Sequence, residues 1–272
     1  MKFYKINFLA SKYFPEHNDH RLMSEGDCAK ARERILNDKP SNLIYLLEKR
    51  YNWMNKYIDG KKFVYELGCG AGLAKFFIRN PNLCLTDITN FDWVDRYEDA
   101  QNLSFESNSV DAFVCSHMIH HLSQPFLFLK KAIDCLKPGG IIVINDVYLS
   151  LSLRFLLRST HHEGWSYDID VFSDTEICNK PDDPWSGNNA IPKLLFKNRN
   201  EFESIFKGSE IIHFKLREFL IFPISGGVIT KVKTLNLPKF SLNIIPKLDC
   251  MLVKYFPDLF AMGMEVIIQK KL

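Results

Sequence analysis

The hydrophobic and polar positions of the chain change their period near residue 60. Residues 28 to 37 and 41 to 58 carry apolar side chains at helical spacing, and Gly60 ends the second stretch. Beyond it, short apolar runs and longer periodic segments predict strands at 63–67, 83–86, 112–115 and 141–145 and helices at 72–79, 90–97 and 124–136. This alternation is typical of a parallel sheet with crossover helices. We therefore expect an α/β sheet behind an N-terminal helical cap.

The regularity weakens after residue 146. Residues 147 to 200 are rich in Ser, Asp, Asn, Pro and His, which predicts an insertion. Farther on, the pattern predicts a helix at 199–206, a strand at 210–221, an irregular segment at 222–262 and a last strand at 264–270. Two late strands without a long helix between them predict an antiparallel, hairpin-like end to the sheet.

Composition narrows the class of protein. Of the 272 residues, 46% are hydrophobic and 25% are charged, as in soluble globular proteins. We expect one domain over 1–272, made of a cap at 1–60, a cofactor-binding half at 61–146 and a substrate-side half at 147–272. The net charge of +3 and the lack of a long basic run argue against a nucleic-acid partner.

The cysteines and the N-terminus bear on the compartment. Seven cysteines form no C-x-x-C pair, and an odd number cannot all pair within one chain, so reduced thiols are the simpler interpretation. The first residues lack the apolar core of a signal peptide, and no run reaches the roughly 18 apolar residues of a membrane span. We therefore expect a cytoplasmic protein without a transmembrane segment.

A glycine loop follows the first predicted strand. Gly68, Gly70 and Gly72 stand where backbone can approach a ligand closely, since no Cβ is in the way. A dinucleotide fingerprint needs its third glycine at the position of Leu73, so the spacing disfavours a pyrophosphate and favours a cofactor without one. Glu66, at the end of the strand, is suited to anchoring an ammonium group.

Two acidic residues strengthen the prediction of a cofactor site. Asp87 ends the second predicted strand, where a carboxylate can accept both hydroxyls of a ribose; a turn or helix-cap role is the alternative. Asp99 precedes Ala100 in a loop, where the carboxylate could accept from an adenine amino group while an amide donates to the ring. Alone, Asp99 would be a solvated loop acid.

Six blocks of sequence resemble class I S-adenosylmethionine-dependent methyltransferases of the type 11/12 kind, at 66–72, 86–88, 99–105, 109–116, 118–122 and 136–144. The resemblance implies a Rossmann-like, seven-stranded, mostly parallel sheet with one antiparallel strand, helices on both faces and an insertion after strand 5. It also implies S-adenosylmethionine as cofactor and S-adenosylhomocysteine as product, bound by Glu66, Gly68, Cys69, Gly70, Gly72, Asp87, Ile88, Asp99, Ala100, Ser116 and His117. The flanking segments resemble bacterial methyltransferases associated with surface-polysaccharide gene clusters.

Histidines are the candidate general bases of such an enzyme. His117 follows the fourth strand, where the family places residues near the donated methyl, and it is equally suited to cofactor contact or to base catalysis. His161, in the insertion, is the second candidate, whereas His121 is better interpreted as a packing or capping residue. Further substrate or base candidates lie in the insertion and at the end of the fifth strand: His162, Glu163, Tyr167, Asp146 and Tyr148. The run His161, His162 and Glu163 predicts no metal, because adjacent side chains rarely converge on one ion, and the polar run at 16–20 predicts none either.

Methyl transfer to a small molecule, such as a sugar or glycan-precursor hydroxyl or amine, is the leading functional hypothesis. An RNA or protein methyltransferase and a non-catalytic cofactor-binding subunit are the alternatives, and a dehydrogenase is disfavoured by Leu73. We therefore expect a small-molecule acceptor and no nucleic-acid partner. The one protein assembly that we consider is a homodimer.

Overall fold

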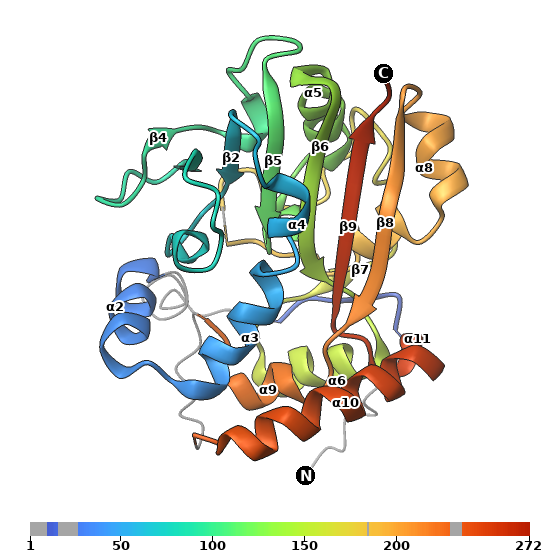
Figure 1. Cartoon of the computed structure of the whole chain (residues 1–272). Coiled ribbons are helices and arrows are strands. Elements are labelled where there is room, and N and C mark those ends of the chain that lie inside the picture. The colour runs from blue at the N-terminus through green and yellow to red at the C-terminus, as the bar shows by residue number, and fades with distance from the viewer. Residues whose placement is uncertain (1–9, 16–26, 184, 229–235) are drawn as a thin grey trace.

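The computed structural model describes residues 10–15, 27–183, 185–228 and 236–272, and its centre is a seven-stranded sheet (Figure 1). The strand order is β4-β3-β2-β5-β6-β9-β8. In chain order the strands are β2 (Val64–Leu67), β3 (Leu83–Asp87), β4 (Arg96–Tyr97), β5 (Val110–Ser116), β6 (Leu136–Val147), β8 (Ser209–Arg217) and β9 (Gly263–Lys270). Within this described sheet, β9 runs opposite to the other six strands and pairs antiparallel with β6 and β8. The prediction of a mostly parallel sheet with one antiparallel strand is confirmed.

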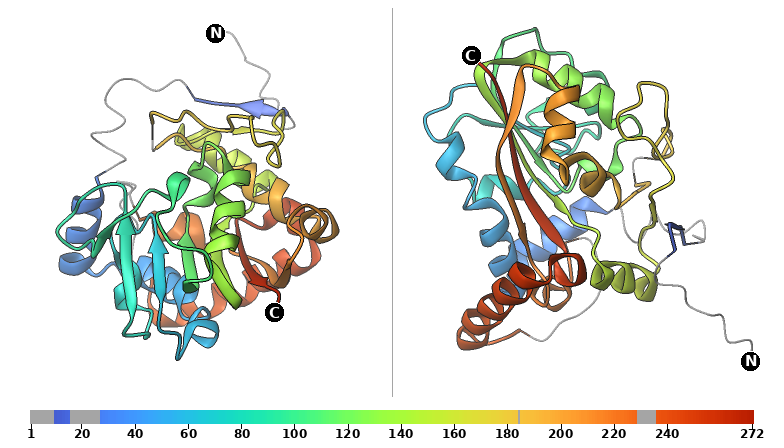
Figure 2. Two further views of the ribbon diagram at one scale, coloured as in Figure 1. Left: turned by 90° about the horizontal axis from the view of Figure 1, so that it is seen from above. Right: turned by 90° about the vertical axis from the view of Figure 1, so that its right-hand side faces the viewer.

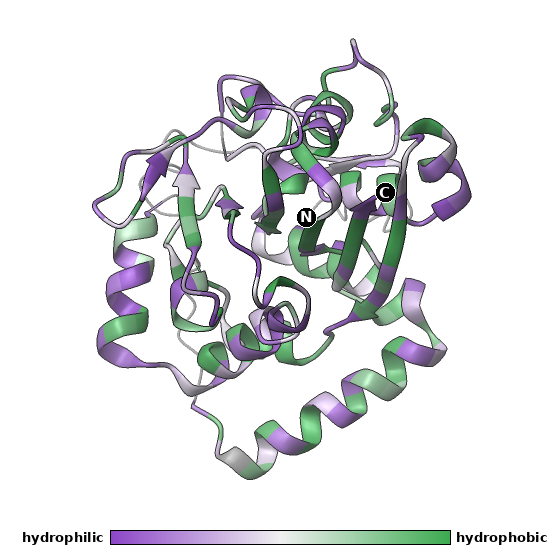
Figure 3. Cartoon of the chain, turned by 45° about the horizontal axis from the view of Figure 1, so that its top comes forward, coloured by the Kyte–Doolittle hydropathy of each residue, from purple (hydrophilic) through white to green (hydrophobic). Residues whose placement is uncertain are grey.

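The central strands are buried on both faces. Along β6, Ile142 and Ile144 pack into one core cluster, while Ile141 and Val143 pack into another on the opposite face. This alternation follows from the two-residue period of a strand, and it explains the nearly continuous apolar run. In Figure 3 the central strands are green for most of their length, whereas the long helix at the bottom alternates between green and purple.

Helices cover both faces, as predicted (Figure 2). The N-terminal cap lies on one face, and it consists of α2 (Cys28–Asp38), α3 (Ser41–Tyr51) and α4 (Asn55–Ile58). The opposite face is covered by α5 (Pro125–Cys135), α7 (Ile191–Phe196) and α8 (Arg199–Ile205). Three short 3-10 turns complete the central part, η1 (Leu73–Phe76), η2 (Ala100–Asn102) and η3 (Ile119–His121).

The carboxyl ends of the parallel strands meet a layer of later elements. In Figure 1 the arrowheads of β5 and β6 point toward it. The layer contains α6 (Leu151–Thr160), α9 (Ile221–Ser225), α10 (Lys239–Tyr255) and α11 (Pro257–Phe260). Beside it, β1 (Lys12–Tyr13) pairs with β7 (Trp165–Ser166). The insertion after β6 thus carries α6 and β7 as well as α7, and α6 lies at the edge where open α/β sheets bind ligands.

Several predicted elements are wrong. No helix forms at 90–97, because Phe91 and Trp93 stack face to face at 4.7 Å and the chain then enters β4 beside β3. The predicted helix at 72–79 is reduced to the 3-10 turn η1. The segment at 222–262 is not irregular, since it contains the 17-residue helix α10 with Pro246 inside it. A long helix therefore does separate β8 from β9, although the two strands pair antiparallel as predicted.

Along the residues that the structure describes, no helix combines the length and the apolar character needed to cross a bilayer.

Candidate active site

The glycine loop after β2 requires glycine for reasons of backbone and packing. Gly68 and Gly72 have φ angles of 64° and 66°, in the left-handed region that other residues rarely adopt. A Cβ on Gly68 would lie 2.8 Å from Met118 Cγ, and a Cβ on Gly72 would lie 2.4 Å from Trp93 Cδ1. The loop is therefore held in one sharp conformation at the end of β2.

Two side chains from other segments hold this loop. Trp93 donates from Nε1 to the carbonyl oxygen of Gly70 at 2.8 Å. Arg32, on α2, donates from Nη1 to the carbonyl oxygen of Ala71 at 2.9 Å, and its guanidinium lies 4.9 Å from the ring of Trp93. Sequence reasoning missed both residues, because a helix predicted at 90–97 assigns Trp93 no role in the loop. The neighbouring aromatics in that segment were the signal.

Glu66 lies buried beneath the loop and lacks one partner. Its side chain is 1% exposed, and Tyr51 donates its hydroxyl to Oε1 at 3.5 Å, whereas Oε2 meets no hydrogen-bond partner among the residues that the structure describes. Burial raises the pKa of this carboxyl to about 8, because water no longer stabilises its charged form. A cationic group near the loop would favour the charged form of this carboxyl. An orphaned acceptor of this kind indicates a ligand donor.

Asp87 combines a structural role with exposure to the cavity. Its Oδ2 accepts from the amide of Gly70 at 2.8 Å, and its Oδ1 accepts from the amide of Thr89 at 2.9 Å. Each carboxylate oxygen retains a further lone pair for a ligand hydroxyl. Asp99 likewise caps η2, since its Oδ1 accepts from the amide of Gln101 at 2.8 Å. The turn and cap alternatives for these acids are thus compatible with ligand binding.

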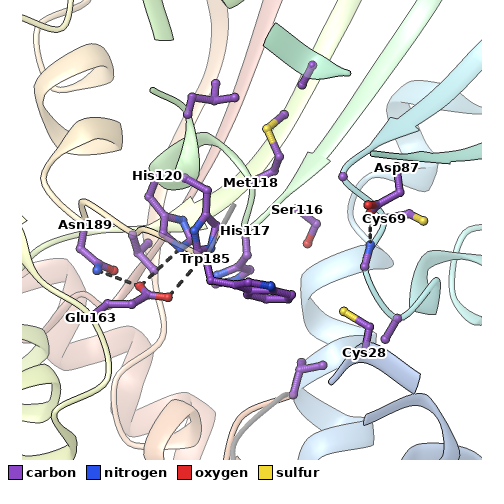
Figure 4. Close-up of a pocket in the computed structure, with 18 of the residues that line it drawn as sticks. Cys28, Cys69, Asp87, Ser116, His117, Met118, His120, Glu163, Trp185 and Asn189 are labelled. Atoms are coloured by element: carbon purple, nitrogen blue, oxygen red, sulfur yellow. Dashed lines mark hydrogen bonds and ion pairs between the residues drawn. The ribbon is translucent and has the colours of Figure 1, made fainter. Parts of the chain in front are cut away.

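A cavity of about 950 Å³ opens at the carboxyl ends of the strands (Figure 4). Nine of the eleven predicted cofactor residues line it: Gly68, Cys69, Gly70, Asp87, Ile88, Asp99, Ala100, Ser116 and His117. Glu66 and Gly72 do not reach the lining. The cavity continues past Ser116 and His117 into a second half, which receives side chains from α3, α6, α9 and the loops around residues 163 and 185.

Three segments that are distant in sequence are tied together in this second half. Gly164 and Asn188 form an isolated parallel bridge, and the amide of Asn188 donates to the carbonyl oxygen of His120 at 2.9 Å. A Cβ on Gly187 would lie 2.8 Å from Glu163 Cδ, so the loop presses directly on that carboxylate. These contacts bring Glu163 to the histidines that follow β5.

Asp146, His120 and Glu163 form a buried chain of polar groups. Asp146 Oδ1 lies 2.5 Å from His120 Nδ1, and His120 Nε2 lies 3.5 Å from Glu163 Oε2. Asn189 donates to the same Glu163 oxygen at 2.9 Å. Burial lowers the pKa of His120, but the two flanking carboxylates outweigh it and raise that pKa to about 9. The sequence made Glu163 a substrate or base candidate within the insertion but gave His120 no role beside it, because nothing local brings the two together.

The other two histidines near Glu163 complete this cluster. His121 Nε2 lies 3.9 Å and His162 Nε2 lies 3.6 Å from Glu163 Oε1. Burial lowers the pKa of His121, and the positive charge of the neighbouring His120 adds to this effect; together they bring the pKa to about 4. His121, interpreted from the sequence as a packing residue, lines the cavity instead.

The two predicted general bases have different locations. His117 lines the cavity with a φ of 54°, and burial together with the guanidinium of Arg50 lowers its pKa to about 3. Its imidazole is therefore neutral near pH 7. His161 ends α6 on the protein surface, outside the lining, and its Nδ1 lies 3.4 Å from the hydroxyl of Tyr13. The structure thus brings His117 to the cofactor residues and does not bring His161 there.

A buried ion pair fixes the wall beside His117. Arg50 of α3 is 3% exposed and donates from Nη2 to Glu218 Oε2 at 2.6 Å and from Nε to Oε1 at 3.1 Å. Burial opposes ionisation of Glu218, yet Arg50 and Arg217 lower its pKa to about 2. The pair joins the N-terminal cap to the end of β8, and no sequence motif indicates it.

Residues 65–144 match a protein family described as "Methyltransferase domain". The tRNA U34 carboxymethyltransferase of Campylobacter curvus (strain 525.92) is 22% identical to the chain, over 53% of this chain and 61% of that protein. The chain therefore spans less than two thirds of the length of this relative.

Solved structures with similar folds include a SAM-dependent methyltransferase from Archaeoglobus fulgidus, which is 20% identical with a TM-score of 0.48, over 83% of this chain and 93% of that one. Another is a chain from the complex between the Haloferax volcanii Trm112 methyltransferase activator and a methyltransferase. It is 13% identical with a TM-score of 0.48, over 94% of this chain and all of that one (100%).

Proposed function

We propose that this chain, whose residues 65–144 are a class I S-adenosylmethionine-dependent methyltransferase domain, transfers a methyl group to a small-molecule acceptor. The observation that carries the proposal is one continuous cavity with the predicted cofactor residues in one half and polar, apolar and aromatic side chains in the other. Small-molecule sites usually measure roughly 300–1,000 Å³, so this cavity has room for the cofactor and a small acceptor together.

The residues present fit the cofactor. S-adenosylmethionine, when bound, supplies a methyl group carried on a positively charged sulfur. Glu66, with its orphaned Oε2, would attract the ammonium group through the loop, and Asp87 would accept from the ribose hydroxyls with its remaining lone pairs. Asp99 and Ala100 line the same half and would bind the adenine. This fit rests on the unpaired carboxylate oxygen and on the lining of the cavity.

His117 is the proposed general base. It lies where the cofactor half meets the acceptor half, and its imidazole is neutral, so a nitrogen lone pair is available. In the transfer, His117 takes the proton that the acceptor's hydroxyl or amine loses as its bond to the methyl carbon forms and the carbon–sulfur bond breaks. The enclosing side chains hold the acceptor in line and exclude water.

The lining of the acceptor half supports a small, partly apolar acceptor. Leu153 and Leu157 of α6 and Phe222 of α9 supply apolar surface, while Trp185 offers an aromatic face beside His121. Aromatic faces pack well against sugar rings, which favours a sugar or glycan-precursor hydroxyl or amine. The seven cysteines are free, which supports a cytoplasmic location.

Calorimetry on the full chain tests the cofactor, and a methylation assay tests the acceptor. We expect S-adenosylmethionine and S-adenosylhomocysteine to bind and NAD not to bind. A panel of sugars and glycan precursors incubated with methyl-labelled cofactor should yield one labelled product. Tight binding of NAD alone would overturn the proposal.

Transfer to RNA is the second candidate, because the curated relative is named for action on tRNA. The small net charge of +3 disfavours it, since binding to a phosphate backbone depends on many basic contacts. Label transferred to tRNA, and to none of the small molecules, would favour this candidate. Cofactor binding without any transfer would instead indicate a non-catalytic subunit.

A further inference from the structure

The imidazole of His120 faces the carboxylate of Glu163 (Figure 4), and His121, which also lines the cavity, directs Nε2 to the same carboxylate. Their Nε2 atoms lie 3.5 Å and 3.9 Å from the two oxygens of Glu163, and the three ligating atoms lie within 4.8 Å of one another. His120 and Glu163 are buried, and His121 is largely so. Three potential ligands from two distant segments thus meet at one point.

The other ring nitrogens of the histidines already have partners. His120 Nδ1 lies 2.5 Å from Asp146 Oδ1, and His121 Nδ1 lies 3.3 Å from the carbonyl oxygen of Ser186. Both partners are acceptors, so each ring keeps a proton on Nδ1, and Nε2 is the atom that can coordinate an ion once it carries no proton. A carboxylate or carbonyl that orients the far nitrogen in this way is the usual support of a metal-binding histidine.

The carboxylates behind the cluster are oriented as well. Asp146 Oδ2 accepts from the amide of Ile119 at 2.9 Å, and Asn189 donates to Glu163 Oε2 at 2.9 Å. Glu163 is therefore held with its oxygens toward the Nε2 atoms of the two imidazoles. A metal ion bound there takes the place of the proton that His120 Nε2 otherwise directs toward this carboxylate.

The spacing of the three groups fits one ion. Separations of 3.5 Å and 3.9 Å exceed a good hydrogen bond. Ligand atoms placed tetrahedrally at about 2.1 Å from a zinc ion lie about 3.4 Å apart, which is close to these distances. Little movement is needed to bring all three onto one metal.

We propose that His120, His121 and Glu163 form a binding site for a divalent transition-metal ion, Zn²⁺ being the expected one, in the acceptor half of the cavity. Two nitrogens and a carboxylate leave at least one coordination position open. This position faces the cavity, and we assign it to the hydroxyl oxygen of the acceptor, a role that rests on the proposed function. A metal-bound hydroxyl loses its proton more readily, and His117 receives that proton in the proposed transfer.

A second group, made of His117, His120 and Asp146, has its donor atoms equally close together. Asp146 is already engaged by His120, and it also accepts from two backbone amides, Ile119 and Val147. We therefore assign Asp146 to orienting His120 rather than to binding the ion. The expectation of no metal rested on His161, His162 and Glu163 as neighbours in sequence, and here Glu163 meets ligands contributed by η3 instead.

Metal binding can be measured on the full chain without any turnover. Protein stripped with a chelator is titrated with Zn²⁺ by calorimetry and with Co²⁺ by visible absorption. We expect one equivalent of each metal to bind, with at least a hundredfold weaker affinity in Glu163→Gln and His121→Ala. Asp146→Asn should weaken affinity by about 10- to 100-fold, as expected for a residue that orients a ligand. His161→Ala, a neighbouring histidine outside the cavity, should match the wild type.

S-adenosylmethionine affinity, measured on the same variants, shows that each one is folded. It should change less than twofold in Glu163→Gln, so that loss of metal is distinguished from loss of structure. Acetohydroxamate, an oxygen chelator, should alter the spectrum of the Co²⁺ form if a coordination position is open. Absence of metal binding in the wild type, or undiminished binding in Glu163→Gln, would overturn the site. An unaltered spectrum would overturn the acceptor role, and metal binding without cofactor binding would sink the proposed function alone.

Discussion

The two halves of the cavity are built on different principles. The cofactor half is built on the loop that follows β2. Its polar groups are largely main-chain atoms and acidic side chains that accept hydrogen bonds from main-chain amides, as Asp87 does from Gly70. The acceptor half is formed by side chains from α3, η3 and the loops around residues 163 and 189. Buried groups of opposite charge are paired there. The cofactor half is therefore shaped by local backbone geometry. The acceptor half is shaped by ion pairs between residues that lie far apart in the sequence.

The largest expected effect is on stability and lies in the acceptor half. Arg50→Met leaves the carboxylate of Glu218 buried with only Arg217 as partner, so we expect a loss of about 3 kcal/mol in unfolding free energy, measured by urea denaturation. The control is Lys75→Met, which breaks the exposed pair with Asp95 and should cost less than about 1 kcal/mol. An equal loss of unfolding free energy in the two variants would contradict the special importance of the buried pair.

The same buried pair predicts an acid dependence of stability. The folded-state pKa of Glu218 is about 2, below its ordinary 4.5, so the unfolded chain binds more protons between these values. The stabilisation is therefore complete above pH 4.5 and is lost as pH falls toward 2, by up to about 3 kcal/mol. Denaturation curves across this window measure the slope. A slope that Arg50→Met leaves unchanged would show that another group causes it.

A smaller effect is expected on ligand affinity in the cofactor half. Asp87→Ala removes a charged acceptor from the cavity, so binding of S-adenosylmethionine should weaken more than tenfold, or by roughly 1.5 to 3 kcal/mol. Calorimetry provides the measurement. Asp38→Ala, at the exposed end of α2, should bind as the wild type does. Similar affinities for the two variants would remove Asp87 from the site.

The smallest effect tests how the glycine loop is supported. Trp93→Phe retains the ring but removes the donor to the carbonyl oxygen of Gly70, which should cost about 1 kcal/mol, or about fivefold in affinity for S-adenosylmethionine. Trp53→Phe, outside the cavity, serves as the matched control. An unchanged affinity in Trp93→Phe would mean that Arg32 and Asp87 hold the loop without this hydrogen bond.

The sequence predicted the strands around the glycine loop because their signals are local. Apolar runs ending in Leu67, Thr86 and Cys115 indicated parallel strands, and the strand pairing places these ends together as expected. The predictions failed where a tertiary contact overrides the local pattern. Stacking of Phe91 on Trp93 replaced a helix, and α10 formed despite Pro246, which a local reading takes as a helix breaker.

The acceptor half could not be predicted for a related reason. His161 was predicted as a general base because it belongs to a polar run in the insertion. The left-handed turn at the end of α6 leaves it on the surface, outside the cavity lining. Glu163, two residues on, lies in the cavity because the chain from 186 to 189 folds against it. No periodic pattern in the sequence indicates the surface position of His161 or the cavity position of Glu163.

By itself the sequence determined most strands of the sheet, their ends and the glycine loop that lines one half of the cavity, because hydrophobic period and glycine spacing act within a few residues of each other. Only the tertiary structure decided which side chains face the acceptor, as with Arg50 beside Glu218 and His120 beside Glu163. The physical reason is that buried charges and lone pairs are compensated by whichever groups the packed elements bring near. That choice is made across separations of more than forty residues.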